Sequence, residues 1–236
     1  RIEPRADVMA RYAGSRKTFL ADGDPPQTGE ILIQEDLART LELIAEKGFD
    51  GFYRGETAQE MLNDVAKYGG NWNAQDLTGY KVVERTPMVI DYNGWRIVTA
   101  PPPSSGGVAI AQMLNILEPW NLRTMPPVMR THLITEAMRR AYRDRSLYLG
   151  DPDFTQIPIE RLISRNYAAG LRASINPDKA TPSSLLPGKL APGEDDETTH
   201  FSIIDSAGNR VSATQTVNLT YGSGMIVEGT GFLLNN

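Results

Sequence analysis

Apolar residues recur at helical spacing over most of the first 175 positions of the chain. In the segment 35–47, Leu37, Leu41 and Ile44 follow one another at intervals of four and three residues, which is the pattern of one helix face. Gly48 comes directly after this segment and can adopt the positive φ that often ends a helix. We therefore predict a helix over 35–47 that ends at this glycine.

The same reasoning predicts four more helices before position 176. They are 57–68, 108–117, 128–148 and 160–175. Thr57 and Glu60 have the spacing of a capping box, which would begin the first of these helices. In the longest helix, Ile134, Met138 and Ala141 would share one face. This part of the chain is thus predicted to be mainly helical, with short strands.

Two short strands are predicted among these helices, at 88–90 and 96–99, and the Asn93-Gly94 pair between them is a strong hairpin signal. A loop rich in serine and glycine, 104–107, then leads into the 108–117 helix. Its backbone amides could cradle an anion, or it could be a rigid turn with a serine N-cap. It lacks both the lysine of a phosphate-binding loop and GxGxxG spacing, so nucleotide binding is not supported.

The segment 176–197 differs in composition from the rest of the chain. It contains prolines at positions 177, 182, 187 and 192 and ends in four consecutive acidic residues. Prolines at this spacing exclude a helix or a central strand, and a stretch of this length is either a functional segment or a solvated linker. The acidic run is interpreted as a solvated tail rather than as a calcium site.

A second hairpin is predicted from strands at 198–204 and 210–218. Because side chains alternate between the faces of a strand, Thr198, His200 and Ser202 share one face of the first strand. The polar face of the second strand contains Ser212, Thr214, Thr216 and Asn218. Placing the two polar faces on the same side requires paired residues whose numbers sum to an even value, for example 202 with 212, 200 with 214 and 198 with 216. This register requires an odd number of loop residues, with Gly208 at positive φ.

This register would bring Thr216 opposite Thr198 and place Asn218 one diagonal step away. A hydroxyl there could hydrogen-bond Thr198, and an amide could bind a polar substrate. The same pattern is also that of a half-buried ladder of threonine and serine that stabilises a sheet. The pattern alone leaves both interpretations open.

Thr198 could act as a nucleophile only under one condition. A threonine hydroxyl within a chain needs a base to take its proton. If the bond after Glu197 is cut, the new α-amino group, with a pKa of about 7.7–8.0, can supply that base. Thr198 would then be nucleophile and base in one residue. His200 would lie about 6–7 Å along the strand and is expected only to pack or to hydrogen-bond.

Composition and charge narrow the classes of function. The net charge is −5 and no basic run occurs, so nucleic acid and anionic membranes are not expected partners. The absence of cysteine excludes thiol chemistry and disulfides, and with two histidines we expect neither a metal site nor a cofactor. His132 and Glu136 are expected to form a surface pair. No apolar run is long enough to span a membrane, and both ends look like cuts through a larger protein.

Longer motifs point to a particular family. After position 197 they are TTHFS at 198–202, DxxGN at 205–209, TxN at 216–218, YGSG at 221–224 and GFLLNN at 231–236. Before it they are DGFYxG at 50–55, PPPSSGG at 101–107, DRSxYLGDPD at 144–153 and PGKLAP at 187–192. Together these motifs resemble the γ-glutamyltranspeptidase family, and the resemblance covers essentially the whole chain.

The resemblance implies the α+β fold of N-terminal-nucleophile hydrolases, a four-layer αββα sandwich, of which this chain would form a part. It implies self-cleavage between Glu197 and Thr198. Residues 1–197 would then be the C-terminal part of a large subunit, with 176–197 as its linker, and 198–236 the N-terminal part of a small subunit. Thr198 would carry the acyl group as an ester, Thr216 would hydrogen-bond it, and Asn218 would bind the α-amino end of the substrate.

The implied activity is γ-glutamyl transfer from glutathione-like amides to water, an amino acid or a dipeptide. The family's oxyanion-hole glycines and the arginine that binds the substrate carboxylate would lie outside this chain. Two alternatives stay open: an acylase of the glutaryl, cephalosporin or poly-γ-glutamate type, and an uncut relative that serves as a structural or binding module. The resemblance also implies that the two subunits pair after cleavage and that the protein is periplasmic or secreted.

Overall fold

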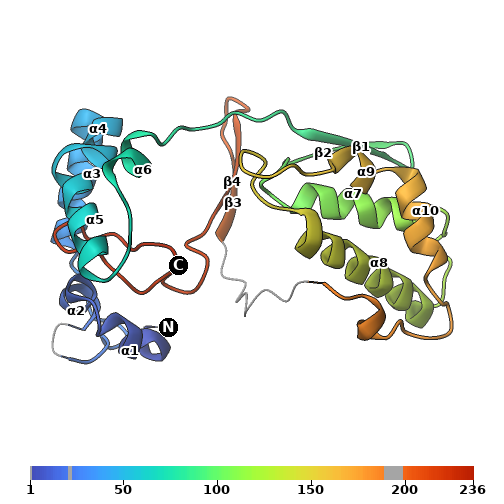
Figure 1. The fold of residues 1–236 in the computed structure, drawn as a ribbon, viewed down its shortest axis with the longest axis horizontal. Coiled ribbons are helices and arrows are strands. Elements are labelled where there is room, and N and C mark those ends of the chain that lie inside the picture. The colour runs from blue at the N-terminus through green and yellow to red at the C-terminus, as the bar shows by residue number, and fades with distance from the viewer. Residues whose placement is uncertain (1, 21–22, 189–198) are drawn as a thin grey trace. The chain divides into compact units, whose positions relative to one another are not determined.

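The computed structural model describes residues 2–20, 23–188 and 199–236, and the chain divides into two compact units. The first unit contains residues 1–82 and 193–236, and the second contains residues 83–192. Figure 1 shows the elements of both units, which we describe separately. The described residues combine helices with two antiparallel hairpins, β1–β2 and β3–β4.

The first unit joins the N-terminal helices to the last forty residues of the chain. Its helices are α1 (Ala6–Met9), α2 (Ala13–Phe19), α3 (Glu35–Lys47), α4 (Phe49–Tyr53), α5 (Gly55–Lys67) and α6 (Ala74–Thr78), preceded by a 3₁₀ turn at Glu3–Arg5. Its strands are β3 (Thr199–Ile204) and β4 (Arg210–Gln215). The main apolar core of this unit consists of Ala58, Met61, Val65, Leu77, Met225, Val227 and Leu234. Residues from both ends of the chain therefore share one core.

The helix predicted at 35–47 is confirmed as α3, and Gly48 has a φ of +57° as expected. The face predicted for it is only partly covered by the described residues, since Leu41 is 57% exposed. The side chain of α3 that is buried is Thr40, whose Oγ1 donates to the carbonyl of Thr230 at 2.7 Å. A polar anchor, rather than the apolar stripe, thus fastens this helix.

The predicted capping box at Thr57 and Glu60 is wrong. Helix α5 begins at Gly55, so Thr57 lies within its first turn, where it is buried. The Thr57 hydroxyl donates to the carbonyl of Gly51 in α4 at 2.9 Å, so it serves the contact between two helices instead of a helix end. A capping box does occur at α6, between Asn73 and Asp76.

The second unit packs its helices around α7 (Gly106–Leu117). The other elements are β1 (Met88–Tyr92), β2 (Trp95–Thr99), α8 (Pro127–Tyr148), α9 (Ile159–Leu162), α10 (Arg165–Ala173) and a 3₁₀ turn at Ser183–Leu185. In Figure 1, α7 lies between the β1–β2 hairpin and α8, and it contacts β1, α8, α9 and α10. The core of the unit consists of Ile116, Leu117, Leu133, Ala137 and Ala168.

The first hairpin is confirmed with the predicted turn. Strands β1 and β2 pair from Met88 with Thr99 to Tyr92 with Trp95, which leaves a two-residue loop. Asn93 and Gly94 have φ values of +47° and +80°, as a type I′ turn requires. At the start of α7, however, the side chain of Ser105 does not cap the helix; its Oγ accepts from Nε of Arg145 at 3.1 Å.

Helix α8 is confirmed over its predicted length, but its buried face differs from the predicted one. Met138 is 43% exposed, whereas Leu133, Ala137 and Ala141 are buried. The face is offset because it also contains buried charged side chains. These are Glu136, Arg140 and Asp144. The single helix predicted at 160–175 is divided into α9 and α10, since the Ser164 hydroxyl accepts from the backbone N–H of Tyr167 and begins a new helix.

Candidate active site

The β3–β4 hairpin has the predicted register. Ser202 pairs with Ser212 and His200 with Thr214, so the polar faces of the two strands lie on the same side. The loop contains five residues, 205–209, and Gly208 has a φ of +85°. A register set by the alternation of polar and apolar side chains is thus present in the structure.

The loop is held by a single carboxylate. Asp205 accepts hydrogen bonds from the backbone N–H of Ala207 and of Asn209, at 2.9 and 2.8 Å, and from Nδ2 of Asn209 at 2.7 Å. The hydrogen bonds from the side chain and then the backbone of Asn209 lower the pKa of Asp205. The carboxylate therefore stays ionised and can accept all of these bonds. This loop geometry explains the DxxGN motif at 205–209.

His200 is engaged by the hydroxyls of the polar face. Its Nδ1 lies 2.7 Å from Oγ1 of Thr214, and its Nε2 lies 3.1 Å from Oγ of Ser212 and 3.3 Å from Oγ of Ser202. Both ring nitrogens therefore have hydroxyl partners within the ladder. This is the hydrogen-bonding role expected for His200.

The structure describes the chain that follows the proposed nucleophile but not the nucleophile itself. Strand β3 begins at Thr199, paired with Gln215, while Glu197 and Thr198 lie outside the described residues. The predicted pairing of Thr198 with Thr216 therefore stays a prediction.

The second strand is shorter than predicted. It ends at Gln215, after which the Thr216 hydroxyl accepts the backbone N–H of Asn218 at 2.8 Å, and Asn218 has a φ of +74°. A threonine hydroxyl commonly closes such a turn, and asparagine tolerates the left-handed region better than most residues. Asn218 thus follows a turn rather than continuing the strand face, which corrects the expected extension of β4 to position 218.

Beyond this turn, the final segment is fastened to the N-terminal helices by polar groups that the apolar pattern did not reveal. Ser15 is fully buried; its Oγ donates to the carbonyl of Gly224 and accepts the backbone N–H of Ile226, both at 2.7 Å. The carboxylate of Asp64 accepts the backbone N–H of Glu228 at 2.9 Å. At Gly14, a Cβ would lie 2.4 Å from the carbonyl oxygen of Ile226, so only glycine permits this approach. Helices α2 and α5 thus hold the segment that follows the candidate nucleophile.

The described residues contain no group of three or more His, Asp or Glu side chains that could hold a metal ion. Among the helices of the described ranges, none is both long and apolar enough to cross a bilayer.

Comparison with known proteins identifies the family. The family model for Gamma-glutamyltranspeptidase matches residues 1–236. The chain is 43% identical over 234 residues to the glutathione hydrolase proenzyme of Escherichia coli, covering 98% of this chain and 40% of that protein. The chain therefore spans about two fifths of the length of the curated relatives it matches.

Solved structures give the same result. The γ-glutamyltranspeptidase of Helicobacter pylori is similar with a TM-score of 0.74 and 37% identity, over 82% of this chain and 57% of that one. A cephalosporin acylase from Bacillus halodurans is similar with a TM-score of 0.79 and 28% identity, over 98% of this chain and 42% of that one. The fold is that of the α+β N-terminal-nucleophile hydrolases. Within this class, the chain belongs to the γ-glutamyltranspeptidase family.

Proposed function

We propose that this chain is the part of a γ-glutamyl hydrolase and transferase that contains the self-cleavage site. In the proposed cleavage, the Thr198 hydroxyl attacks the carbonyl of Glu197, and the acyl group moves from nitrogen to oxygen. This shift breaks the C–N bond and frees the Thr198 α-amino group. Water then opens the ester, which restores the Thr198 hydroxyl and leaves Glu197 with a free carboxylate. Residues 1–197 would end the large subunit, and residues 198–236 would begin the small one. The name of the E. coli relative, a proenzyme, supports this order of events.

In turnover, the free amine takes the proton of the Thr198 hydroxyl as its oxygen attacks the γ-glutamyl amide. The leaving amine departs with a proton, and the γ-glutamyl group stays on Thr198 as an ester. Water releases glutamate, or the amine of an amino acid or dipeptide takes the acyl group. Thr216 would hydrogen-bond the nucleophile, and Asn218 would bind the substrate's α-amino group. We propose a periplasmic or secreted location, as the family resemblance implies.

The observation that carries this proposal is the register of the β3–β4 hairpin. The pairs at 202 with 212 and 200 with 214 are present, and continuing the count by two residues brings 198 to 216. This register supports the placement of Thr198 on the polar face of the hairpin. Thr216 itself lies at the turn that directly follows β4.

The shared core supports pairing of the two subunits after cleavage. The segment 225–234 packs against α5 and α6 in one cluster, and Ile226 packs with Met9, Phe19 and Leu20 in another. These contacts join residues on the two sides of the proposed cut. Because they do not depend on the peptide bond at 197–198, the two chains should stay associated once it is broken.

The proposal is tested on the complete protein. We expect gel electrophoresis to show two bands that co-elute in gel filtration, with Thr-Thr-His-Phe as the N-terminal sequence of the smaller one. The cleaved form should release the amine from a chromogenic γ-glutamyl anilide. The similarity to the Bacillus halodurans enzyme makes an acylase the second candidate, and faster turnover of a glutaryl amide than of the γ-glutamyl anilide would favour it. A chain that stays single after long incubation would favour an uncut module.

Replacing Thr216 with alanine should slow both self-cleavage and turnover without unfolding the protein. The side chain lies at the surface of the described structure, so its loss opens no cavity, but a hydrogen bond to the nucleophile would be removed. We expect a loss of about two- to tenfold in the rate of each step, since a hydrogen bond between neutral groups contributes about 0.5–1.5 kcal/mol. Thr216→Ser should retain most of both rates. Equal rates for the alanine variant and the parent would remove Thr216 from the site.

A further inference from the structure

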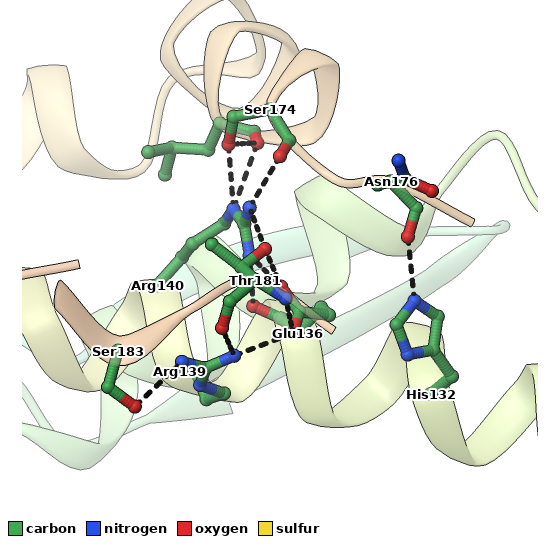
Figure 2. Close-up of polar contacts among 9 residues, drawn as sticks. His132, Glu136, Arg139, Arg140, Ser174, Asn176, Thr181 and Ser183 are labelled. Carbon is green, nitrogen blue, oxygen red and sulfur yellow. Dashed lines mark hydrogen bonds and ion pairs between the residues drawn. The ribbon is translucent and has the colours of Figure 1, made fainter. Parts of the chain in front are cut away.

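We propose that a buried charged network on α8 holds the linker that precedes the cleavage site, and that this contact favours self-cleavage. This inference rests on the proposed function. The network, which we call the α8 clip, consists of Glu136, Arg139, Arg140, Ser174 and Thr181 (Figure 2). The first three residues belong to α8, and the last two follow α10.

Arg140 is the centre of the clip. Its side chain is fully buried, and all five of its N–H groups have acceptors. Nη1 donates to the carbonyl and to Oε2 of Glu136, at 3.1 and 2.6 Å. Nε donates to Oγ of Ser174 at 2.9 Å, while Nη2 donates to the Ser174 carbonyl at 2.9 Å and to Oγ1 of Thr181 at 3.2 Å. One guanidinium therefore joins α8 to the end of α10 at Ser174 and to Thr181 of the linker.

Glu136 holds the same linker residue from the other side. Its Oε2 accepts the hydroxyl of Thr181 at 2.5 Å, and its Oε1 accepts the backbone N–H of Thr181 at 3.1 Å. Arg139 completes the grip, because its Nη1 donates to Oε1 of Glu136 at 2.7 Å and to the carbonyl of Thr181 at 2.6 Å. Every polar group of Thr181, in the backbone and in the side chain, is thus bound by α8.

The contact extends along the helix in both directions. Towards its start, Nε2 of His132 donates to the carbonyl of Asn176 at 2.8 Å, so His132 pairs with the linker and not with Glu136 as the sequence suggested. Towards its end, Nε of Arg143 donates to the carbonyl of Pro187 at 3.2 Å. The linker from 176 to 187 therefore runs parallel to α8 and is bound at successive turns. The described part of the segment is therefore held by α8, although most of its residues are exposed.

Polar contacts have to hold this segment because it has little apolar surface to bury. Its few apolar side chains include Leu185, which is 70% exposed, and its prolines cannot form a helix or join a sheet. A buried ion pair is seldom the most stable way to fill a core, but its directional bonds fix one register. The α8 clip is therefore suited to holding a chain at a defined position.

The linker residues bound by the α8 clip lie close in sequence to the proposed cleavage site. The last clipped residue is Pro187, which leaves ten residues, 188–197, before Thr198. Without the contacts to α8, the chain between α10 and Thr198 would be twenty-four residues long, 174–197. The entropy of closing a loop grows with the logarithm of its length, so the longer stretch should reach the conformation required for attack about three- to fourfold less often. The clip thus favours self-cleavage by shortening the loop.

The test compares a release variant with a matched control, both in the complete protein. The release variant is Thr181→Val with Arg139→Met and Arg143→Met, which removes the Thr181 hydroxyl, all bonds of Arg139 and the bond from Arg143 to Pro187 but leaves the Glu136–Arg140 pair intact. The control is Thr124→Val with Arg130→Met and Arg165→Met, which changes the same residue types at surface positions; Thr124 hydrogen-bonds Asn121, and Arg165 hydrogen-bonds Glu118. Thr181→Ser is the conservative variant, since it keeps the hydroxyl.

Two readouts separate positioning from folding. In an uncut Thr198→Ala background, the release variant should raise the hydrogen-exchange rate of amides in 176–187 by about tenfold or more, given the loss of bonds to a charged group. In the cleavable protein, it should slow self-cleavage by about three- to fourfold and leave turnover per cleaved molecule unchanged. Inserting fourteen Gly and Ser residues after Gly188, with the clip intact, lengthens the loop equally and should slow cleavage by the same factor. Thr181→Ser and the control should behave like the parent.

Unchanged hydrogen exchange in the release variant would show that the network does not hold the linker. Faster exchange with an unchanged cleavage rate would show that the clip holds the linker without aiding cleavage. Either result overturns this inference and leaves the proposed function standing. A parent protein that is never cut would instead overturn the proposed function, and the inference with it.

Discussion

Replacing Thr198 with alanine should leave the complete protein as a single uncut chain without γ-glutamyl turnover. The same oxygen is proposed to attack the Glu197 carbonyl during cleavage and the substrate amide during turnover, so one substitution removes the nucleophile of both reactions. The free α-amino group, the proposed base, also never forms, and base assistance alone contributes about 10²–10⁴-fold. Gel electrophoresis over several days and an assay with a chromogenic γ-glutamyl anilide check the two losses.

Thr198→Ser is the control, since it keeps a hydroxyl and, after cleavage, the α-amino group. We expect it to retain measurable cleavage and turnover, at reduced rates. Thr199→Ala removes a neighbouring hydroxyl. Because the Thr199 side chain points to the opposite face of the strand, this variant should leave both reactions largely intact. Cleavage of the Thr198→Ala protein at the parent's bond would show that another group is the nucleophile.

Local geometry explains which parts of the fold could be predicted. The register of β3–β4 follows from alternation, because a slip of one residue would move Ser202 and its neighbours to the other face. The Asn93-Gly94 turn follows from the positive φ that both positions need. Gly48 ended α3 for the same reason. In each case a constraint within a few residues decided the structure.

The errors come from groups whose partners are distant in sequence. Apolar periodicity assumes that charges face solvent, so it could not reveal that Glu136 and Arg140 are buried by pairing with each other and with Thr181. The same holds for Thr57, whose hydroxyl found a carbonyl in α4, and for Ser105, whose partner is Arg145. A polar side chain carries no local sign of whether its partner is water or protein.

The candidate site illustrates both situations. His200 was placed among the hydroxyls of the ladder by alternation alone, and the structure confirms its contacts. Asn218 was expected to continue the strand, but the competing bond between Thr216 and its backbone N–H turned the chain. Ser15, some two hundred residues from the segment that it fastens, had no signal beyond being a small polar residue in a helix.

The fully buried ion pair should make Glu136→Ala one of the most destabilising substitutions in the second unit. It would leave the Arg140 guanidinium buried without its carboxylate, and breaking one partner of a buried pair typically costs about 3–5 kcal/mol. The lowered pKa of Glu136 gives a similar free energy of stabilisation. Burial opposes the charge, but the bonds from Thr181, Arg140 and Arg139 outweigh it and lower the pKa of Glu136 to about 2. Compared with the ordinary value of 4.5, this pKa corresponds to about 3 kcal/mol of stabilisation of the folded protein by the ionised carboxylate.

The pH dependence and the partner substitution together test this origin of the effect. Because the pKa of Glu136 is lower in the folded protein, its stabilisation is complete above about pH 4.5 and is lost as the pH falls towards 2. Hydrogen exchange of core amides in α7 and α8, measured on the uncut Thr198→Ala protein, should therefore show the largest difference between Glu136→Ala and the parent at neutral pH and a smaller one near pH 2.5. The double variant Glu136→Leu with Arg140→Met should be more stable than Glu136→Ala alone, because it removes the uncompensated charge and refills the space. A double variant as unstable as the single one would mean that lost packing, and not the buried charge, causes the effect.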